Sequence, residues 1–346
     1  MRAAMYYNNS DIRLEEVPLP QIGSGELLIR IEASGICGSD VMEWYRINKA
    51  PLVLGHEIAG VVEEVGEGVT KYRKGDRVCA SHHVPCNTCH YCLNGHHTAC
   101  QTLRTTRFFP GGFAEYVRIP AINVNCGVYP IPDEVSFEEA TFTEPVACVF
   151  RGQKKAKIQP GQRVLVIGSG ISGLLHINMA KALGAGRIIA VDISEYRLNA
   201  AQRFGAEHTI QIIPGQDIDL QSRIRELNNG LLADRVIICT GAVPAIEQGL
   251  QCVERGGTIL LFAPTEPDKT IPLSINDVFW GSDVTITTSY AGSPADHYDA
   301  LSLIRAKRIN VMEMITHRLP LSETGNGFRL VAEAKESIKV IVEPHK

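Results

Sequence analysis

Residues 163–173 read RVLVIGSGISG, and this stretch decides the fold of the second half of the chain. A short apolar strand leads into three closely spaced glycines, and the apolar run 174–180 that follows has the pattern of a helix. Asp192 ends the next apolar strand, about 20 residues on, where dinucleotide-binding units carry an acidic residue. Missing Cβ atoms let the backbone approach a pyrophosphate, and the helix N-terminus adds positive potential. The stretch predicts a dinucleotide site formed by Gly168, Gly170, Ile171, Ser172, Gly173 and Asp192.

The acidic residue also indicates which dinucleotide binds. A carboxylate at Asp192 accepts hydrogen bonds from the adenine ribose hydroxyls and repels a 2′-phosphate, which favours NAD over NADP. Arg197 follows closely and is a further cofactor-binding candidate, because a guanidinium can accommodate a phosphate. The alternative interpretation is an ordinary tight turn in an α/β domain.

The surrounding sequence repeats a strand followed by a helix. Apolar strands are expected at 163–167, 188–191 and 235–238, which indicates a doubly wound parallel sheet. The polar stretch 212–230 is weakly patterned and is expected to hold a loop. Residues 1 to about 145 show short alternating apolar runs punctuated by Gly and Pro, which is typical of a β-rich domain.

The end of the chain is expected to return to the first domain, because residues 296–307 have a helical pattern and residues 337–342 resemble a strand. We therefore predict an α/β chain of two domains. The β-rich catalytic domain takes residues 1–147 and 288–346, and the nucleotide-binding domain takes residues 148–287. The active site is expected in the cleft between them.

Four cysteines lie close together at a spacing that suits a metal. Their pattern, C-x2-C-x2-C-x7-C, lets four thiolates close a tetrahedron around one Zn²⁺ with no open position, which predicts a structural zinc site. The residues between them are turn formers, so the metal replaces the core that the segment lacks. The alternatives are a disulfide cluster, a redox pair or an iron–sulfur cluster. The predicted ligands are Cys86, Cys89, Cys92 and Cys100.

Composition excludes several classes of protein. The 346 residues are 45% hydrophobic, which is enough for two domains with cores of their own. A net charge of −4 gives no electrostatic reason to expect nucleic acid or an anionic membrane surface. The N-terminus has no apolar signal-like region, and no stretch reaches the ~18 apolar residues of a membrane span. We expect a cytoplasmic protein, whose reducing surroundings favour thiolate ligands.

A second metal site is indicated by Cys37 and by the run Gly55-His56-Glu57. The pattern from Gly55 to Val69, GHE-x2-G-x5-G-x2-V, resembles the zinc signature of the medium-chain, zinc-dependent alcohol and polyol dehydrogenases, with threonine dehydrogenases close by. Residues 112–116 (GFAEY) and 143–145 (TEP) are also similar to segments of that family. The resemblance spans nearly the whole chain. It implies a GroES-like catalytic domain, a Rossmann domain, two zinc ions per chain and NAD.

The resemblance also assigns roles to individual residues. It implies that Cys37 and His56 bind a catalytic zinc, with Glu57 and Glu144 completing the coordination directly or through water. Thiolate, imidazole and carboxylate all bind Zn²⁺, and fewer than four firm protein ligands leave a place for a substrate oxygen. Glu57 is often outside the coordination sphere in this family. The family pattern further adds Thr240 and Phe262 to the expected cofactor-binding residues.

The implied reaction is oxidation of a secondary alcohol. Zinc acts as a Lewis acid on the alcohol, lowers its pKa, and hydride leaves for nicotinamide. Ser39 resembles the family hydroxyl that accepts the substrate proton. Much of the family has a His where this chain has Met42, and a thioether cannot relay a proton, so the proton is expected to leave through water, Glu43 or another route.

Substrate choice is also expected to depart from sorbitol. The polyol-contacting Arg of sorbitol-type relatives corresponds to Ser289 here, so polyols, sugar derivatives and hydroxy-amino acids all remain candidates. Arg104 and Arg107 can bind an anionic substrate group or be solvated. Several histidines crowd the cysteine segment and are expected to be surface loop residues. They are His82, His83, His90, His96 and His97.

Two other functions stay open at this point. The chain can be a zinc-stabilised nucleotide-binding sensor or assembly subunit without catalysis, which Met42 favours and the intact metal residues oppose. It can also be a redox-neutral enzyme that keeps its NAD tightly bound. The resemblance implies a homodimer or homotetramer acting on a small-molecule alcohol or ketone, with no nucleic acid and no membrane partner.

Overall fold

The computed structural model describes residues 1–216 and 218–346. Two compact units are present. Unit 1 comprises Met1–Ala147 and Ala291–Lys346, and unit 2 comprises Cys148–Tyr290. The chain therefore returns to unit 1 between residues 290 and 291, whereas the predicted boundary lay between residues 287 and 288.

Unit 1 is built on two β-sheets. The larger one has seven strands in the order β15-β16-β3-β5-β6-β8, with β7 paired to β3. Its strands are β3 (Leu27–Gly35), β5 (Glu57–Val65), β6 (Arg77–Ala80), β7 (Tyr116–Ile119), β8 (Val128–Pro130), β15 (Ile315–Pro320) and β16 (Lys339–Glu343). The smaller sheet has the order β2-β1-β4. Its strands are β1 (Arg2–Asn8), β2 (Asp11–Glu16) and β4 (Leu52–Val53).

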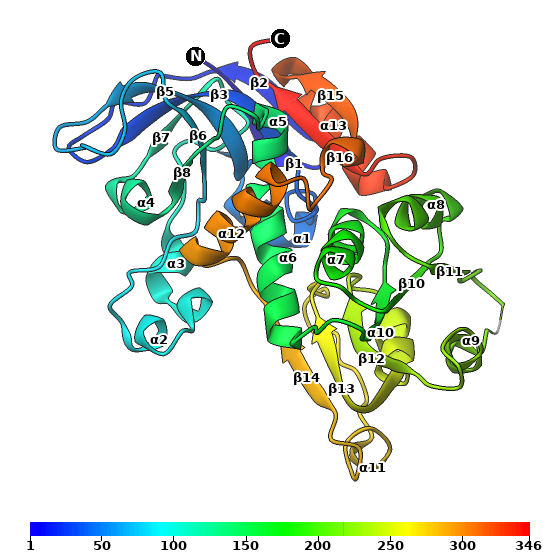
Figure 1. Ribbon diagram of the computed structural model, residues 1–346. Coiled ribbons are helices and arrows are strands. Elements are labelled where there is room, and N and C mark those ends of the chain that lie inside the picture. Colours follow the sequence, from blue (N-terminus) through cyan, green and yellow to red (C-terminus); the bar gives the residue numbers. More distant parts are fainter. Residues whose placement is uncertain (217) are drawn as a thin grey trace. The chain divides into compact units, whose positions relative to one another are not determined.

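The C-terminal strand belongs to the larger sheet, beside a strand from the first part of the chain. Strand β16 pairs antiparallel with β3, and Ile341 and Val342 lie opposite Gly35 and Ser34. Figure 1 shows the C-terminal strand in red beside the N-terminal strands in blue. The first half of β3 alternates, so Leu27, Ile29 and Ile31 enter a core that also contains residues of β5, β6 and β7. The C-terminal segment is thus an integral part of the unit's fold.

Short helices and turns fill the rest of unit 1. Two of them begin with a capping box, in which a Ser side chain and an acidic side chain satisfy each other's backbone N–H groups: Ser136 before α5 and Ser293 before α12. The helices are α1 (Glu43–Arg46), α2 (His90–Leu93), α3 (Gln101–Thr105), α4 (Ala121–Cys126), α5 (Phe137–Thr141), α12 (Pro294–Arg305) and α13 (Thr324–Glu333). The 3₁₀ turns are η1 (Ile47–Lys49), η2 (His97–Ala99), η3 (Met312–Met314) and η4 (Leu321–Glu323). Helix α6 (Thr143–Ala156) contains the junction with unit 2.

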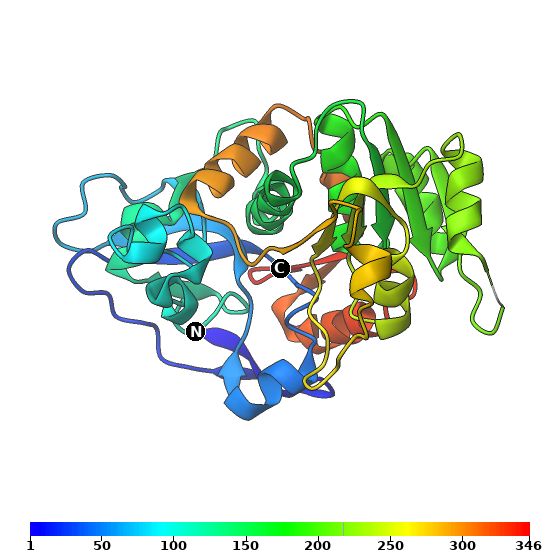
Figure 2. The same ribbon diagram turned by 90° about the horizontal axis from the view of Figure 1, so that it is seen from below.

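Unit 2 is a six-stranded sheet in the order β11-β10-β9-β12-β13-β14, and all its strand pairs are parallel. This is the doubly wound order of dinucleotide-binding sheets. Its strands are β9 (Arg163–Ile167), β10 (Arg187–Asp192), β11 (His208–Gln211), β12 (Ala233–Ile238), β13 (Val253–Leu261) and β14 (Thr285–Thr288). Its helices are α7 (Ile171–Ala182), α8 (Glu195–Phe204), α9 (Leu220–Leu227), α10 (Val243–Leu250) and α11 (Ile275–Val278). Helices pack along the strands in both views (Figures 1 and 2).

The predicted parallel sheet is confirmed. Residues 212–216 and 218–219 belong to no helix or strand, in agreement with the expected loop, but the rest of that stretch is more ordered. The stretch 212–230 contains helix α9, which begins after Asp219, whose side chain accepts a hydrogen bond from the Ser222 backbone N–H at 3.0 Å. Leu220 and Ile224 of this helix are buried in the core of unit 2. The helix was missed because only a few apolar residues anchor an otherwise polar segment.

Candidate active site and metal centres

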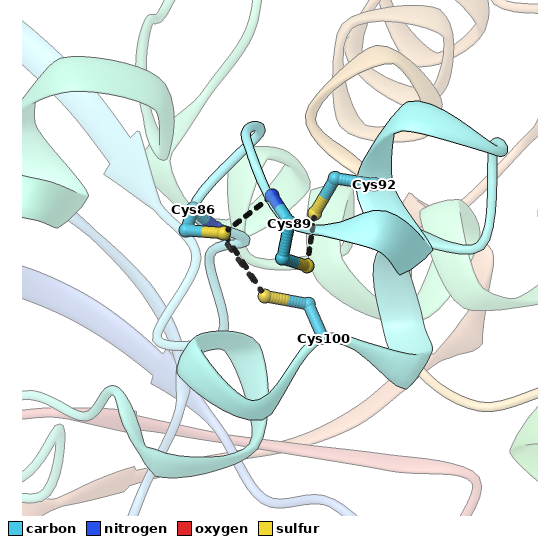
Figure 3. Close-up of side chains that lie close together, drawn as sticks. All are labelled: Cys86, Cys89, Cys92 and Cys100. Atoms are coloured by element: carbon cyan, nitrogen blue, oxygen red, sulfur yellow. Dashed lines mark hydrogen bonds between the residues drawn. The ribbon is translucent and has the colours of Figure 1, made fainter.

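The four cysteines of the predicted structural site converge in unit 1 (Figure 3). One ligand atom from each lies within 4.8 Å of the others. The sulfur atoms of Cys89 and Cys92 are 3.5 Å apart, and those of Cys86 and Cys100 are 3.6 Å apart. Backbone N–H groups of Cys89 and Cys86 donate to the sulfurs of Cys86 and Cys100 at 3.3 and 3.4 Å. Sulfurs at this spacing suit the corners of one tetrahedral Zn²⁺ site.

The local chemistry of these thiols fits a divalent cation. Hydrogen bonds from the backbone and side chain of Thr88 lower the pKa of Cys86 to about 5, whereas burial raises the pKa of Cys92 to about 12. A metal ion offsets the cost of ionising the buried thiol. The lobe has little core of its own, since the buried residues of its apolar cluster are Cys92, Cys100 and Leu103. None of the described cysteines forms a disulfide, which disfavours the disulfide-cluster alternative.

A second ligand group lies at the larger sheet of unit 1. Ligand atoms of Cys37, His56 and Glu57 lie within 4.8 Å of one another. The strand register produces this convergence, because Glu57, the first residue of β5, pairs with Gly35, the last residue of β3. Cys37 follows β3 closely and His56 immediately precedes β5. A thiolate, an imidazole and a carboxylate can fill three positions of a tetrahedral zinc site. The fourth position then stays open, as it does in catalytic zinc sites.

A buried carboxylate orients His56. Oδ1 of Asp40 lies 3.4 Å from Nδ1 of His56, and Oδ2 of Asp40 accepts a hydrogen bond from the Cys37 backbone N–H at 3.0 Å. Burial of Asp40 acts to raise its pKa, but the charges of His56 and Arg46 and the hydrogen bonds hold it below its usual value. A carboxylate on Nδ1 leaves Nε2 of His56 directed to a metal. Asp40 was not among the predicted site residues, and its position three residues after Cys37 was the available signal.

Glu57 has a partner that the sequence analysis missed. Lys339 of β16 forms an ion pair with Oε2 of Glu57, and both side chains are only 1% exposed. The Lys339 ammonium also donates to the carbonyl oxygen of Ile36 at 3.2 Å and lies 5.5 Å from the centre of the Phe142 ring. The ammonium of Lys339 offsets the charge of the buried Glu57 carboxylate beside Cys37 and His56.

Glu144 belongs to neither ligand group found among the described residues. It lies in the first turn of α6 and lines a small cavity with Cys79, Thr143 and His297. Within that cavity, the Cys79 thiol contacts the Thr143 hydroxyl at 3.5 Å. A role for Glu144 at zinc stays a prediction.

Two of the five histidines are not the surface residues that we expected. The ring of His82 lies 4.7 Å from that of His56 and 3.7 Å from that of His83, measured between centroids. Burial and the neighbouring cations lower the pKa of both, that of His83 to about 3. After β6 the chain runs toward the interior of unit 1, and the spacing of the cysteines alone cannot predict this. His90 and His96 are exposed, as expected.

Three other predicted candidates for substrate contact are polar or basic side chains. Arg104 and Arg107 are exposed in and after α3 of unit 1. Ser289 is half-buried at the end of unit 2. None of these three belongs to the metal groups among the described residues.

The glycine turn of unit 2 has the shape that a dinucleotide site needs. Gly168 adopts φ +91°, and a Cβ at Gly173 would collide with the Gly168 carbonyl oxygen, so both positions require glycine. Ile171 and Ser172 begin α7 after this turn. A Cβ on Gly168 would also lie 3.3 Å from the Thr240 side chain, which places Thr240 against the turn.

Asp192 already makes backbone contacts. Its Oδ2 accepts a hydrogen bond from the Ser169 N–H at 2.6 Å, and its Oδ1 accepts one from the Ser194 N–H at 2.8 Å. These bonds hold the carboxylate beside the glycine turn, and its oxygens can still accept further hydrogen bonds. The Arg197 guanidinium carbon lies 3.9 Å from where a Cβ of Gly170 would be. Phe262 packs edge-on against His176 at 4.5 Å between centroids.

Two family models match the chain. The model of the alcohol dehydrogenase GroES-like domain matches residues 23–133, and the model of the zinc-binding dehydrogenases matches residues 172–306. These matches define the class as a zinc-binding dehydrogenase and confirm the predicted GroES-like and Rossmann folds.

Individual relatives agree with this class. Sorbitol dehydrogenase of Gallus gallus is 32% identical over 99% of this chain and 96% of its own length. Among solved structures, alcohol dehydrogenase TADH from Thermus sp. ATN1 has a TM-score of 0.84 at 30% identity, and 2R,3R-butanediol dehydrogenase from Bacillus subtilis has 0.85 at 27%. Each of the two covers 99% of both chains. The chain belongs to the zinc-dependent medium-chain alcohol and polyol dehydrogenase family, and the predicted resemblance is confirmed.

The protein is therefore an oxidoreductase that acts on a small-molecule alcohol with zinc and a nicotinamide cofactor. Within residues 1–216 and 218–346, no helix has the length and apolar character to span a bilayer.

Proposed function

We propose that this enzyme interconverts a secondary alcohol and its ketone with NAD, the alcohol being a polyol, a sugar derivative or a hydroxy-amino acid. The observation that carries the proposal is the convergence of Cys37, His56 and Glu57, since three donors leave one position for a substrate oxygen. The sorbitol and butanediol dehydrogenases among the relatives support alcohols of this kind.

Residues of unit 1 have separate roles in the proposed reaction. When bound, Zn²⁺ polarises the alcohol oxygen and NAD accepts the hydride. Cys37, His56 and Glu57 hold the metal, and Asp40 fixes the orientation of His56. Ser39, whose backbone N–H lies 3.4 Å from the Cys37 sulfur, accepts the substrate proton. A second zinc ion, held by the four clustered cysteines, stabilises their lobe.

The cofactor preference follows from Asp192. Its carboxylate is fixed beside the glycine turn, where it binds ribose hydroxyls and repels a 2′-phosphate. We propose NAD as the cofactor, with Gly168, Gly170 and Gly173 beneath the pyrophosphate. A higher kcat/KM with NADP than with NAD would contradict this assignment.

The test is NADH formation by zinc-replete enzyme on a panel of polyols, sugar alcohols, threonine and simple secondary alcohols. We expect turnover on at least one class of compound, loss of turnover in Cys37→Ser, and no loss in Cys126→Ser, a matched thiol outside both metal groups. Metal analysis should give two zinc ions per wild-type chain and one per Cys37→Ser chain. No turnover with both zinc ions and NAD bound would instead support the nucleotide-binding sensor or the redox-neutral enzyme.

We also propose that the chain is a homo-oligomer through unit 2. Among the described residues no strand pairs with the outer edge of β14, and the segment before it exposes Ile275 by 69% and Trp280 by 79%. An apolar segment beside a free edge suits pairing with a second copy. We place the protein in the cytoplasm, where reducing conditions preserve its thiolate ligands.

A further inference from the structure

Arg46 contacts Ser39 at two points. Its Nε donates to the Ser39 carbonyl oxygen at 2.9 Å, and its Nη2 donates to Ser39 Oγ at 3.1 Å. The same Nη2 lies 3.5 Å from Oδ1 of Asp40. The Arg46 side chain is 15% exposed, so these contacts are largely shielded from water. A permanent positive charge therefore stands beside the hydroxyl to which the proposed function assigns the proton.

The local backbone fixes the position of Arg46. It is the last residue of the single-turn helix α1, in which the backbone N–H groups of Tyr45 and Arg46 donate to the Met42 carbonyl at 2.9 and 3.1 Å. Its guanidinium also lies 4.7 Å from the centre of the Tyr45 ring. The helical turn that begins at Met42, whose thioether cannot relay a proton, thus places the Arg46 side chain against Ser39.

Hydrogen-bond chemistry decides what this contact does. A guanidinium only donates, so Ser39 Oγ must act as the acceptor toward Arg46, and the Ser39 hydrogen must point elsewhere. Arg46 cannot itself take a proton, because its guanidinium stays protonated in proteins. Its effect is to restrict rotation of the hydroxyl and leave both the hydrogen and a lone pair for transfer.

We propose that Arg46 is the positioning residue for Ser39 and makes proton release possible without a histidine at position 42. This inference rests on the proposed function. The substrate hydroxyl gives its proton to Ser39 Oγ while Ser39 passes its own proton to water, and the hydride with its electron pair goes to the nicotinamide. The substrate is oxidised to the ketone, the cofactor is reduced, and one proton is released.

A double-mutant cycle tests this role with zinc-loaded, full-length enzyme. We expect Arg46→Met to lower kcat by about 10-fold to 100-fold while the KM for NAD stays unchanged. In a Ser39→Ala background the same change should have almost no further effect, because Arg46 acts through the hydroxyl. Arg46→Lys should recover part of the loss, since it keeps a donor and the charge but not the two-point contact.

Lys49→Met is the matched control. Lys49 is a cation of the same segment, 4.3 Å from the centre of the Tyr45 ring, and it makes no hydrogen bond to Ser39. Its replacement should leave kcat unchanged. An equal loss in Lys49→Met, or an undiminished loss from Arg46→Met in the Ser39→Ala background, would overturn the inference.

A measurement independent of turnover completes the test. In nitrogen NMR of labelled arginine, hindered rotation of the Arg46 guanidinium should give separate Nη signals, and their exchange should become faster in Ser39→Ala, which removes the contact with Oγ and keeps those with the carbonyl oxygen and Asp40. Merged signals in the wild type would contradict the contact. Zinc content and thermal melting of each variant identify misfolding, and if Arg46→Met misfolds, Arg46→Lys in both backgrounds decides the question.

Inactive wild-type enzyme would defeat the proposed function, and this inference with it. Active wild type with equally active Arg46→Met would defeat this inference alone.

Discussion

Lys339 balances the charge of the Glu57 carboxylate in the Cys37 group of unit 1. Replacing it by Met leaves the Glu57 carboxylate buried and unpaired, and removing one partner of a buried pair costs about 3–5 kcal/mol. We expect Lys339→Met to lower the denaturation midpoint. Lys335→Met, at a side chain that is 79% exposed, is the control. Equal stability of the two variants, measured by urea denaturation, would show that the Lys339–Glu57 pair contributes nothing to the free energy of unfolding.

Residue by residue, the sequence predicted what depends on short spacing. The four-cysteine group follows from a pattern within fifteen residues, and the glycine turn from a strand, a turn and a helix in succession. Lys339 is 282 residues from Glu57, so no local pattern joins them. His82 was misjudged for a similar reason, because its neighbour His56 lies on another segment. Partners brought together by strand register require the folded sheet.

Among the elements, strands β9 and β12 are joined by an ion pair with a calculable pH dependence. Asp234 accepts hydrogen bonds from the backbone N–H, Nε and Nη2 of Arg163 at 2.8, 2.9 and 2.5 Å. Burial acts to raise the pKa of Asp234, but the bonds from Arg163 hold it below the usual 3.8. The stabilisation is therefore fully present above pH 3.8 and is lost as the pH falls through the lowered pKa.

Asp234→Asn should consequently destabilise the protein by about 1.5–3 kcal/mol at neutral pH. The difference from wild type should shrink as the pH falls below 3.8, because the wild-type carboxylate then becomes protonated. Urea denaturation over a series of pH values measures it. Asp299→Asn, at an exposed position of α12, should show no such trend. A difference that stays constant down to strongly acidic pH would mean that the charge of Asp234 is irrelevant.

At the scale of the whole molecule, the proposed oligomer can be tested on unit 2. Wild-type protein should sediment as a dimer or tetramer, and Trp280→Glu should shift it toward the monomer, because a charge would be buried without a partner. Leu14→Glu, at an exposed apolar residue of β2, is the control and should leave the mass unchanged. A monomeric wild type, or a Trp280→Glu variant of undiminished mass, would remove the case for this surface.

The pairing of β16 with β3 also sets an order of events during synthesis on the ribosome. The four cysteines emerge together, so their lobe can take up zinc while most of the chain is still unmade. The Cys37 group is different, because the lysine that balances its carboxylate is added 282 residues after Glu57. Nascent chains that end before Lys339 can therefore form the four-cysteine lobe while the carboxylate of the Cys37 group still lacks its partner.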